Sequence, residues 1–230
     1  GALLAVDEAH ATLVCGESGG GAAEALGVAG QVDLHIGTLS KAFGALGGFV
    51  ATSRDLKSLL LNKGRAYVYS TALPNPVVAA AQAALAVSHR EGWRRAHVWQ
   101  LVERLGSALG VPALSPVVPL VVGSEQAALD LSSHLLREGF HVPAIRPPTV
   151  PPGTCRLRVS LSAAHSNEDV DALVDVVKKY RDPSTPLMAL PFLMEQATQP
   201  HMRAVRWGAQ PAAAAASGGA EGRGVVGSDL

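Results

Sequence analysis

The sequence predicts an α/β protein in which a larger layered unit is followed by a smaller α+β unit. Two observations support this prediction. Short apolar runs alternate with helical stretches over residues 1–104, a pattern typical of strands and helices packed in layers. A break with three prolines at Gly110–Pro119 then precedes a second group of strands and helices. Hydrophobic residues make up 48% of the 230 residues, which is ample for a core.

Short apolar runs predict the strands of the first unit. The predicted strands are Ala2–Val6, Val32–Thr38, Gly48–Ala51 and Ala66–Ser70. The predicted helices are Ser53–Gly64 and Asn75–Arg104, the second interrupted near Gly92, and a flexible glycine-rich loop is expected at Gly16–Gly21. Because Ala2–Val6 is apolar throughout, we expect it to lie buried between two neighbouring strands. A chain that begins inside a sheet is expected to lack its N-terminal part.

The second unit shows clear periodicity. Val117–Val122 is an apolar run that predicts a strand, and Glu125–Glu138 predicts a helix that ends before Gly139. Apolar and polar residues alternate strictly over Arg156–Leu161, as in a strand with one buried face. Asn167–Tyr180 predicts a helix, because its acidic start and basic end suit the helix dipole. Its apolar stripe consists of Val170, Leu173, Val174 and Val177.

These patterns divide the chain into three segments. Residues 1–92 form the larger unit and residues 93–181 the smaller one. Residues 182–230 contain several prolines, a run of five alanines and a glycine-rich stretch, so we expect a low-complexity and mostly disordered tail.

Composition excludes several functional classes. Lys+Arg and Asp+Glu are balanced at 19 each, which argues against a nucleic-acid-binding protein. No apolar run reaches the roughly 18 residues of a membrane span. Two cysteines give no disulfide framework and make a zinc site improbable, so we expect no metal and a reduced, cytoplasmic protein. The final Ser-Asp-Leu resembles a peroxisomal Ser-Lys-Leu signal but lacks its basic residue.

The segment Asp7–His10 spells DEAH, a motif of nucleic-acid helicases in which an acidic pair holds Mg²⁺ beside a nucleotide. The downstream sequence favours another cofactor. Gly37–Phe49 reads "GTLSKAFGALGGF", in which a predicted strand ends in hydroxyl residues, followed by Lys41 and glycines. A helicase has no use for this arrangement, whereas an enzyme that uses pyridoxal phosphate needs it.

The chemistry of pyridoxal phosphate explains the pattern. A lysine amine must hold the cofactor as a Schiff base from a turn that lets it swing away during turnover, which suits Lys41. Hydroxyls of Thr38 and Ser40 are close enough to bind the phosphate. A strand-end carboxylate keeps the pyridine nitrogen protonated, with an attraction of roughly 4 kcal/mol at about 4 Å. Asp7 fits this task, and His10 on the same turn can reach the ring oxygen.

Four motifs in order carry a resemblance to a known family. They read "VDEAHATLVCGESGGG", "GTLSKAFGALGGF", "YSTALP" and "AIRPPTVPPGTCRLRVSLSAAHS". Together they resemble the α-oxoamine synthases, which are fold-type-I pyridoxal-phosphate enzymes. The resemblance covers residues 1–181 and implies part of the large domain of that fold, a mainly parallel sheet with helices, followed by a small α+β domain. The last motif most resembles the branch that condenses pimeloyl-CoA with L-alanine and releases CO₂ in biotin synthesis.

The resemblance implies a set of residues around the cofactor. Lys41 would be the catalytic lysine that holds pyridoxal phosphate covalently. Asp7 would pair with the pyridine nitrogen, His10 would contact the phenolic oxygen, and Thr38 would bind near the phosphate. Glu8 stands where relatives often have a second aspartate, a conservative change that affects none of these roles.

Four further residues are implied to contact a partner subunit or a substrate. Ser70 and Thr71 match positions that reach the phosphate of the partner's cofactor in a homodimer with shared active sites. Thr149 matches a substrate-contacting residue, and Arg158 matches an arginine that grips the amino-acid carboxylate. Arg156 lies on the same strand face as Arg158, so either side chain could instead pair with an acidic residue at the surface.

Two alternative functions stay open on the sequence. Another family member is one, acting like glycine C-acetyltransferase, 5-aminolevulinate synthase or serine palmitoyltransferase on a different acyl-CoA and amino acid. A non-catalytic fragment or scaffold subunit is the other, because motifs that this family places before Asp7 are not in the sequence.

Overall fold

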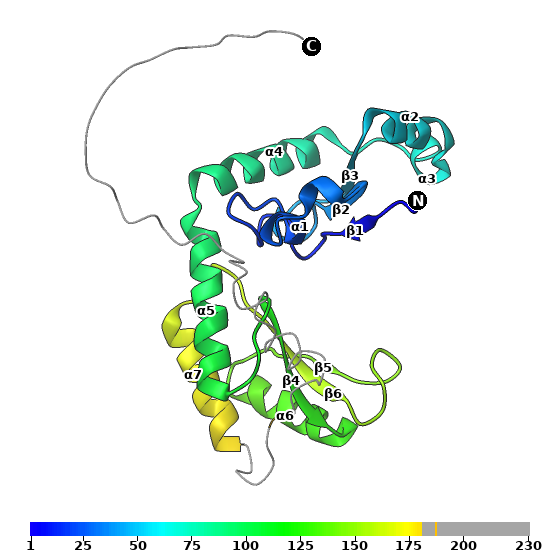
Figure 1. Ribbon diagram of the computed structural model, residues 1–230. Helices are drawn as coiled ribbons and strands as arrows, with labels where there is room; N and C mark the ends of the chain where they lie inside the picture. The colour runs from blue at the N-terminus through cyan, green and yellow to red at the C-terminus, as the bar shows by residue number, and fades with distance from the viewer. Residues whose placement is uncertain (181–186, 188–230) are drawn as a thin grey trace, which may run out of the picture.

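The computed structural model describes residues 1–180 and Leu187. It contains two three-stranded sheets, one in each half of the described chain. Figure 1 shows α4 (Asn75–Arg90) running along the first sheet. From the end of α4, α5 (Trp93–Leu109) extends toward the second sheet. The tail predicted at residues 182–230 lies outside the described residues, apart from Leu187.

The first sheet brings two strand ends to one edge. β1 (Ala5–Asp7) pairs in parallel with β2 (Leu34–Thr38), so that Asp7 lies opposite Ile36. β2 pairs in an antiparallel sense with β3 (Gly48–Thr52). Since parallel strands end at the same edge of a sheet, the residues that follow β1 and β2 lie next to each other.

The expected burial of the first strand is wrong. Leu3 and Leu4 are 64% and 48% exposed, and within the described residues β1 pairs with β2 alone. An apolar strand is buried only when other elements cover it, and no second neighbour flanks β1 in this part of the chain.

The helices of the first half lie near their predicted positions, although the stretch predicted to end at Arg104 continues to Leu109. α2 (Arg54–Lys63) begins after Ser53, whose hydroxyl accepts a hydrogen bond from Leu56 N at 3.4 Å. α4 ends at Arg90 and α5 begins at Trp93, so the predicted interruption near Gly92 is confirmed. The glycine-rich loop predicted at Gly16–Gly21 is followed by a short helix, α1 (Ala22–Ala25), and by a 3₁₀ turn at Ala29–Gln31, neither of which the sequence predicted.

The strand predicted at Ala66–Ser70 is wrong. The chain forms a single helical turn there, α3 (Arg65–Val68). Aromatic and β-branched residues favoured a strand, but a strand needs a neighbour to pair its backbone groups. In the structure Tyr67 N and Val68 N instead donate to Gly64 O, both at 2.9 Å.

The second half forms an antiparallel sheet with helices packed against it. Its strands are β4 (Val117–Gly123), β5 (Ala144–Ile145) and β6 (Cys155–Ser160), in the order β4-β6-β5. Its helices are α5, α6 (Glu125–Arg137) and α7 (Asn167–Tyr180). Figure 1 shows α5 and α7 side by side. The bounds of α7 match the sequence prediction.

The packed core belongs to the second half. The hydrophobic cluster of buried residues runs from Leu101 to Val177 and joins α5, both longer strands, α6 and α7. In residues 1–92 the buried hydrophobic residues are Cys15, Ala23 and Ala81. No helix in the described part of the chain has the length and apolar character needed to cross a bilayer.

Candidate active site

Lys41 lies on a tight turn just beyond the end of β2. Leu39 N donates to Gly47 O at 2.9 Å, and Gly44 N donates to Lys41 O at 2.9 Å, so the backbone closes on itself around the lysine. The Lys41 side chain is exposed. A closed turn at a strand end presents a long, unpaired amine from a fixed backbone, which is what a covalent attachment point requires.

Two hydroxyls stand beside this turn. Thr38 Oγ1 and Ser40 Oγ share a hydrogen bond of 2.8 Å, and Thr38 Oγ1 also donates to Gly47 O at 3.1 Å. These bonds fix the Thr38 side chain at the end of β2, next to the lysine turn.

Asp7 and His10 come from the neighbouring strand end. Asp7 Oδ1 accepts a hydrogen bond from Ala9 N at 2.9 Å, which turns the chain sharply after β1. Glu8 N donates to Ile36 O at 2.7 Å, which holds this turn against β2. Asp7 and His10 are both exposed at the edge of the sheet where Lys41 lies.

The electrostatics of His10 link residues from both halves of the chain. Partial burial lowers the pKa of the His10 imidazole below its ordinary value, and the positive charges of Lys41 and Arg158 lower it further. The Asp7 carboxylate acts in the opposite direction. The structure therefore brings three predicted site residues, Asp7, Lys41 and Arg158, within electrostatic reach of a fourth, His10.

The two arginines of β6 differ in what they contact. Arg156 donates to Thr154 O at 2.9 Å and to Thr154 Oγ1 at 3.0 Å, so its guanidinium braces its own loop. Arg158 is exposed, and in the described part of the chain no hydrogen bond or ion pair engages its guanidinium. Of the two, Arg158 is the one free to bind an anion.

The remaining three predicted residues, Ser70, Thr71 and Thr149, come from other segments of the chain. Ser70 donates its hydroxyl to Ala66 O and, like Thr71, is exposed in the segment after α3. Thr149 is exposed between β5 and β6, with its backbone N donating to Arg146 O at 3.0 Å. Among the described residues, no hydrogen bond or ion pair joins any of the three to the lysine turn.

Glu8 has a structural role that the sequence did not reveal. Its buried carboxylate accepts hydrogen bonds from Ala22 N at 2.6 Å and Ala23 N at 3.1 Å, and His35 Nδ1 lies 3.7 Å away. Gly21 has φ +116°, and a Cβ there would lie 2.2 Å from Glu8 Oε2. The carboxylate thus caps the start of α1, and glycine is required beside it.

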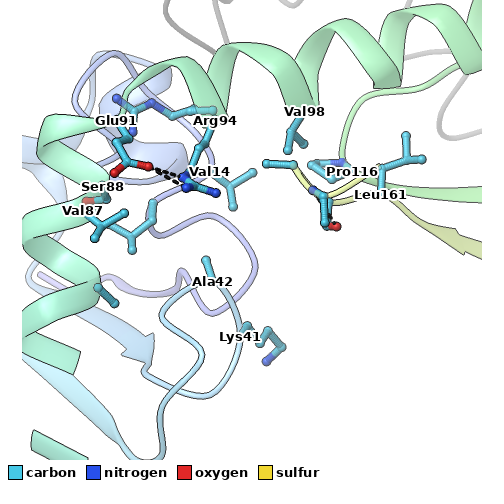
Figure 2. Close-up of a pocket in the computed structure, with 16 residues that line it drawn as sticks. Val14, Lys41, Ala42, Val87, Ser88, Glu91, Arg94, Val98, Pro116 and Leu161 are labelled. Carbon is cyan, nitrogen blue, oxygen red and sulfur yellow. Dashed lines mark hydrogen bonds and ion pairs between the residues drawn. The ribbon is translucent and has the colours of Figure 1, made fainter. Parts of the chain in front are cut away.

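A cavity of about 610 Å³ adjoins the lysine turn. Figure 2 shows Lys41 and Ala42 on one side of it, Val14 and the helical residues Val87 and Arg94 on another, and Leu161 across from them. The cavity is mainly apolar and lies between the first and second halves of the chain. Among the described residues, no cluster of three or more His, Cys, Asp or Glu side chains is arranged to hold a metal.

Comparisons with known proteins identify the family of this chain. A profile of the family "Aminotransferase class I and II" matches residues 1–177. The chain belongs to the aminotransferase class I and II family. This membership confirms the predicted α/β fold class.

The names of individual relatives are more specific than the name of the aminotransferase class I and II family. An 8-amino-7-oxononanoate synthase from Arabidopsis thaliana is 51% identical over 182 residues, which are 79% of this chain and 38% of the relative. A protein of the same name from Anaeromyxobacter dehalogenans is 50% identical over 180 residues, covering 76% of this chain and 45% of the relative. The chain spans about half the length of these curated relatives, or less. These names confirm the predicted resemblance.

Solved structures of the aminotransferase class I and II fold are also similar. A serine palmitoyltransferase from Sphingomonas wittichii superimposes with a TM-score of 0.74 at 35% identity, over 78% of this chain and 47% of that one. An 8-amino-7-oxononanoate synthase from Francisella tularensis has a TM-score of 0.66 at 26% identity, over 77% and 54%. A further structure, described as "SPT with PLP internal aldimine", has a TM-score of 0.73 at 30% identity, over 78% of this chain and 47% of that one.

Proposed function

We propose that this chain carries the lysine-bearing part of a pyridoxal-phosphate-dependent acyltransferase of biotin synthesis. The reaction joins pimeloyl-CoA and L-alanine to give 8-amino-7-oxononanoate, CoA and CO₂. The single observation that carries the proposal is the electrostatic grouping of Lys41, Asp7, His10 and Arg158, which come from segments far apart in the sequence. The names of the most similar curated relatives support the choice of substrates.

The donor set around the lysine turn fits pyridoxal phosphate. Lys41 offers an exposed amine for the aldehyde, and the Thr38 hydroxyl, held beside the lysine turn, would turn from Gly47 O to donate to the phosphate. In the described part of the chain only one oxygen of Asp7 has a partner, so the other is open to a protonated ring nitrogen. A neutral His10, favoured by its lowered pKa, would face the phenolic oxygen.

Each residue has a defined task in this proposal. When bound, pyridoxal phosphate supplies an electron sink for a carbanion at the Cα of the amino acid. Asp7 holds the ring nitrogen protonated through its negative charge. Lys41 would accept the proton from the Cα of the amino acid as a general base. Arg158 binds the amino-acid carboxylate and fixes the orientation of the Cα–H bond toward Lys41.

The main experiment tests Lys41. The chain is titrated with pyridoxal phosphate, and the visible absorbance of covalently attached cofactor is followed. Lys41→Ala is expected to abolish that absorbance and any turnover, whereas Lys57→Ala, which removes an exposed lysine of α2, is expected to change neither. Attachment that survives in Lys41→Ala would refute the assignment. Absence of attachment in the unmodified chain would favour the alternative of a non-catalytic fragment or scaffold subunit.

Substrate choice is tested separately. CoA release is measured across pairs of acyl-CoA and amino acid, and we expect pimeloyl-CoA with L-alanine to be the best pair. Preference for glycine with acetyl-CoA or succinyl-CoA, or for serine with a long acyl-CoA, would move the chain to another member of the family. The serine palmitoyltransferase structures noted above support this alternative only as relatives.

We also infer a homodimer with shared active sites in the cytoplasm. The exposure of Ser70 and Thr71, which make no hydrogen bond or ion pair with their own lysine turn among the described residues, supports a role at a partner's cofactor. Two free buried cysteines are consistent with a reducing compartment. Mixing inactive Lys41→Ala chains with inactive Thr71→Val chains should restore turnover if the sites are shared, and no restoration would contradict the shared site.

A further inference from the structure

The first turns of α5 contact two loops that are distant in the sequence. Trp99 Nε1 donates to Val14 O at 2.9 Å, and Arg95 Nη2 donates to Glu17 O at 2.7 Å. His97 Nε2 lies 2.8 Å from His165 O. One short stretch of helix therefore holds a loop of the first half and a loop of the second half.

The first of these loops continues rigidly from His10. Thr12 N donates to Glu8 O at 2.8 Å and Cys15 N donates to Ala11 O at 2.8 Å, so consecutive turns connect His10 to Val14. Leu13 has φ +63°, a conformation that a leucine rarely adopts. Such strain persists only where the surroundings impose it. The bond from Trp99 to the next carbonyl is one of the contacts that does so.

Arg95 is fitted closely to the same loop. A Cβ at Gly19 would lie 2.9 Å from Arg95 Nη1, so the guanidinium packs directly on the backbone. Arg95 Nε is buried without a hydrogen-bond partner among the described residues, and this costs free energy. The hydrogen bond from Arg95 Nη2 to Glu17 O is one contact that offsets this cost and holds the arginine on the loop.

The second loop follows the strand that carries Arg158. β6 ends at Ser160, and Ser162 N donates to His165 Nδ1 at 3.2 Å, which closes the turn after the strand. The contact between His97 and His165 O fixes this turn on α5.

The two loops face the same cavity. Leu13 and Val14 line the cavity of about 610 Å³ on one side, and Leu161–Ala164 line it on the other. Figure 2 shows Val98 of α5 between Val14 and Leu161. Because open space separates the loops here, the helix that contacts both determines how far apart they lie.

We propose that Trp99 and Arg95 are positioning residues that set the distance between the His10 turn and Arg158. The amino acid bound at the proposed site must reach the lysine turn and Arg158 at once, so this distance governs amino-acid binding. The inference rests on the proposed function. It predicts that loosening the contacts of α5 weakens binding of the amino acid and leaves binding of the acyl-CoA unchanged.

Two matched pairs of variants in the full chain test the inference. Trp99→Phe removes the indole N–H bond to Val14 and keeps most of the ring, while Trp93→Phe is its control because Trp93 is exposed and stacks on Arg94. Arg95→Gln removes the bond to Glu17. Its control is Arg90→Gln, because Arg90 is exposed, pairs with Glu91 and does not line the cavity.

Two measurements are made on each variant. The first is hydrogen exchange at the amides of Leu13, Val14 and Cys15, which needs no cofactor. The loss of one hydrogen bond is expected to speed this exchange about three- to tenfold in Trp99→Phe and Arg95→Gln, with no change in the controls. The second is the KM for L-alanine in the cofactor-loaded chain, expected to rise about three- to tenfold with the KM for the acyl-CoA unchanged.

The outcomes separate this inference from the proposed function. Unchanged exchange in Trp99→Phe and Arg95→Gln would overturn the inference. Faster exchange with both KM values unchanged, or with both raised equally, would also overturn it, because the helix would then have only a structural role. An unmodified chain that binds no L-alanine would contradict the proposed function, and the inference, which rests on it, would fall as well even if exchange were faster.

Discussion

At the scale of single residues, the pKa of His10 reports the charges that surround it. Lys41 and Arg158 both disfavour the imidazolium, so Lys41→Met is expected to raise the pKa of His10 toward its ordinary value of 6.5. Proton NMR of the imidazole across a pH titration measures this pKa. Asp7→Asn provides the opposite control, because removing the carboxylate should lower the same pKa further. A His10 pKa that responds to neither change would mean that the groups are not close.

The same residue contributes to the pH dependence of folding. Because the pKa of His10 is lower in the folded chain, the unfolded chain binds more protons as the pH falls below about 6.5. The contribution of His10 to stability is therefore unfavourable at low pH. The free energy of unfolding decreases as the pH falls from about 6.5 to the lowered pKa of the folded chain. His10→Gln is expected to flatten this part of the profile of unfolding free energy against pH, measured with urea from about pH 7 to pH 5.

Cys15 should be chemically inert in the folded chain. Burial raises the pKa of its thiol from 9.0 to about 11, with a further contribution from the Glu8 carboxylate. Cys155 is also buried. Since the thiolate is the reactive form, Ellman's reagent near pH 8 is expected to label neither cysteine rapidly, and to label both after unfolding in guanidinium. Rapid labelling of Cys15 in the folded chain would contradict its burial.

The sequence could point to site residues where the chemistry is local. Asp7, His10 and Lys41 were predicted from their places at or just after a strand end, and the structure brings these two strand ends to the same edge of the sheet, while their roles stay predictions. The roles of Glu8 and Trp99 were missed because their partners, Ala22 and Val14, lie 14 and 85 residues away. No local pattern encodes such a contact. The one available sequence signal was the glycine run that ends at Gly21, since glycine allows the backbone to approach a side chain such as Glu8 closely.

At the scale of elements, α5 packs on α7 through both buried apolar side chains and an exposed ion pair, and these two kinds of contact should differ in their contribution to stability. Leu105 is fully buried in the core cluster, so Leu105→Ala is expected to lower the free energy of unfolding by about 2–5 kcal/mol. Arg104, its neighbour, binds Asp171 through two hydrogen bonds of 2.6 and 2.5 Å, but both side chains are nearly half exposed. Solvent screens such a pair, so Arg104→Met is expected to change stability far less. Urea unfolding compares the two, and equal losses would contradict this ranking.

Elements with their own end signals were predicted well. α2 has a serine cap, and α7 has acidic and basic ends with an apolar stripe, so both were found near their observed bounds. α3 and β5 were not. The single turn of α3 carries strand-forming residues, and the two-residue β5 exists only because β6 pairs with it. For such short elements, tertiary contacts outweigh intrinsic propensity.

At the scale of the whole molecule, apolar burial is distributed unevenly. The second half holds the complete core cluster, whereas apolar side chains of β3 and α2, including Phe49, Val50 and Leu59, are more than a third exposed. In relatives about twice as long, further chain is available to cover such surfaces. The first half therefore carries most of the proposed site residues, including Lys41 and Asp7, and the second half supplies most of the folding free energy within the described residues.

This asymmetry predicts different behaviour for the two halves when they are separated. Residues 93–187, which include Leu187 because it packs against the core cluster, are expected to unfold cooperatively as an independent unit. Residues 1–92 alone are expected to show no cooperative transition, since their buried apolar residues are one cysteine and two alanines. Circular dichroism during thermal unfolding of each fragment measures this, with Leu105→Ala in the larger fragment as the control for a specific core. A cooperative transition in residues 1–92 would show that this half is stabilised by contacts within itself, and the proposed boundary near residue 92 would then separate two autonomous domains.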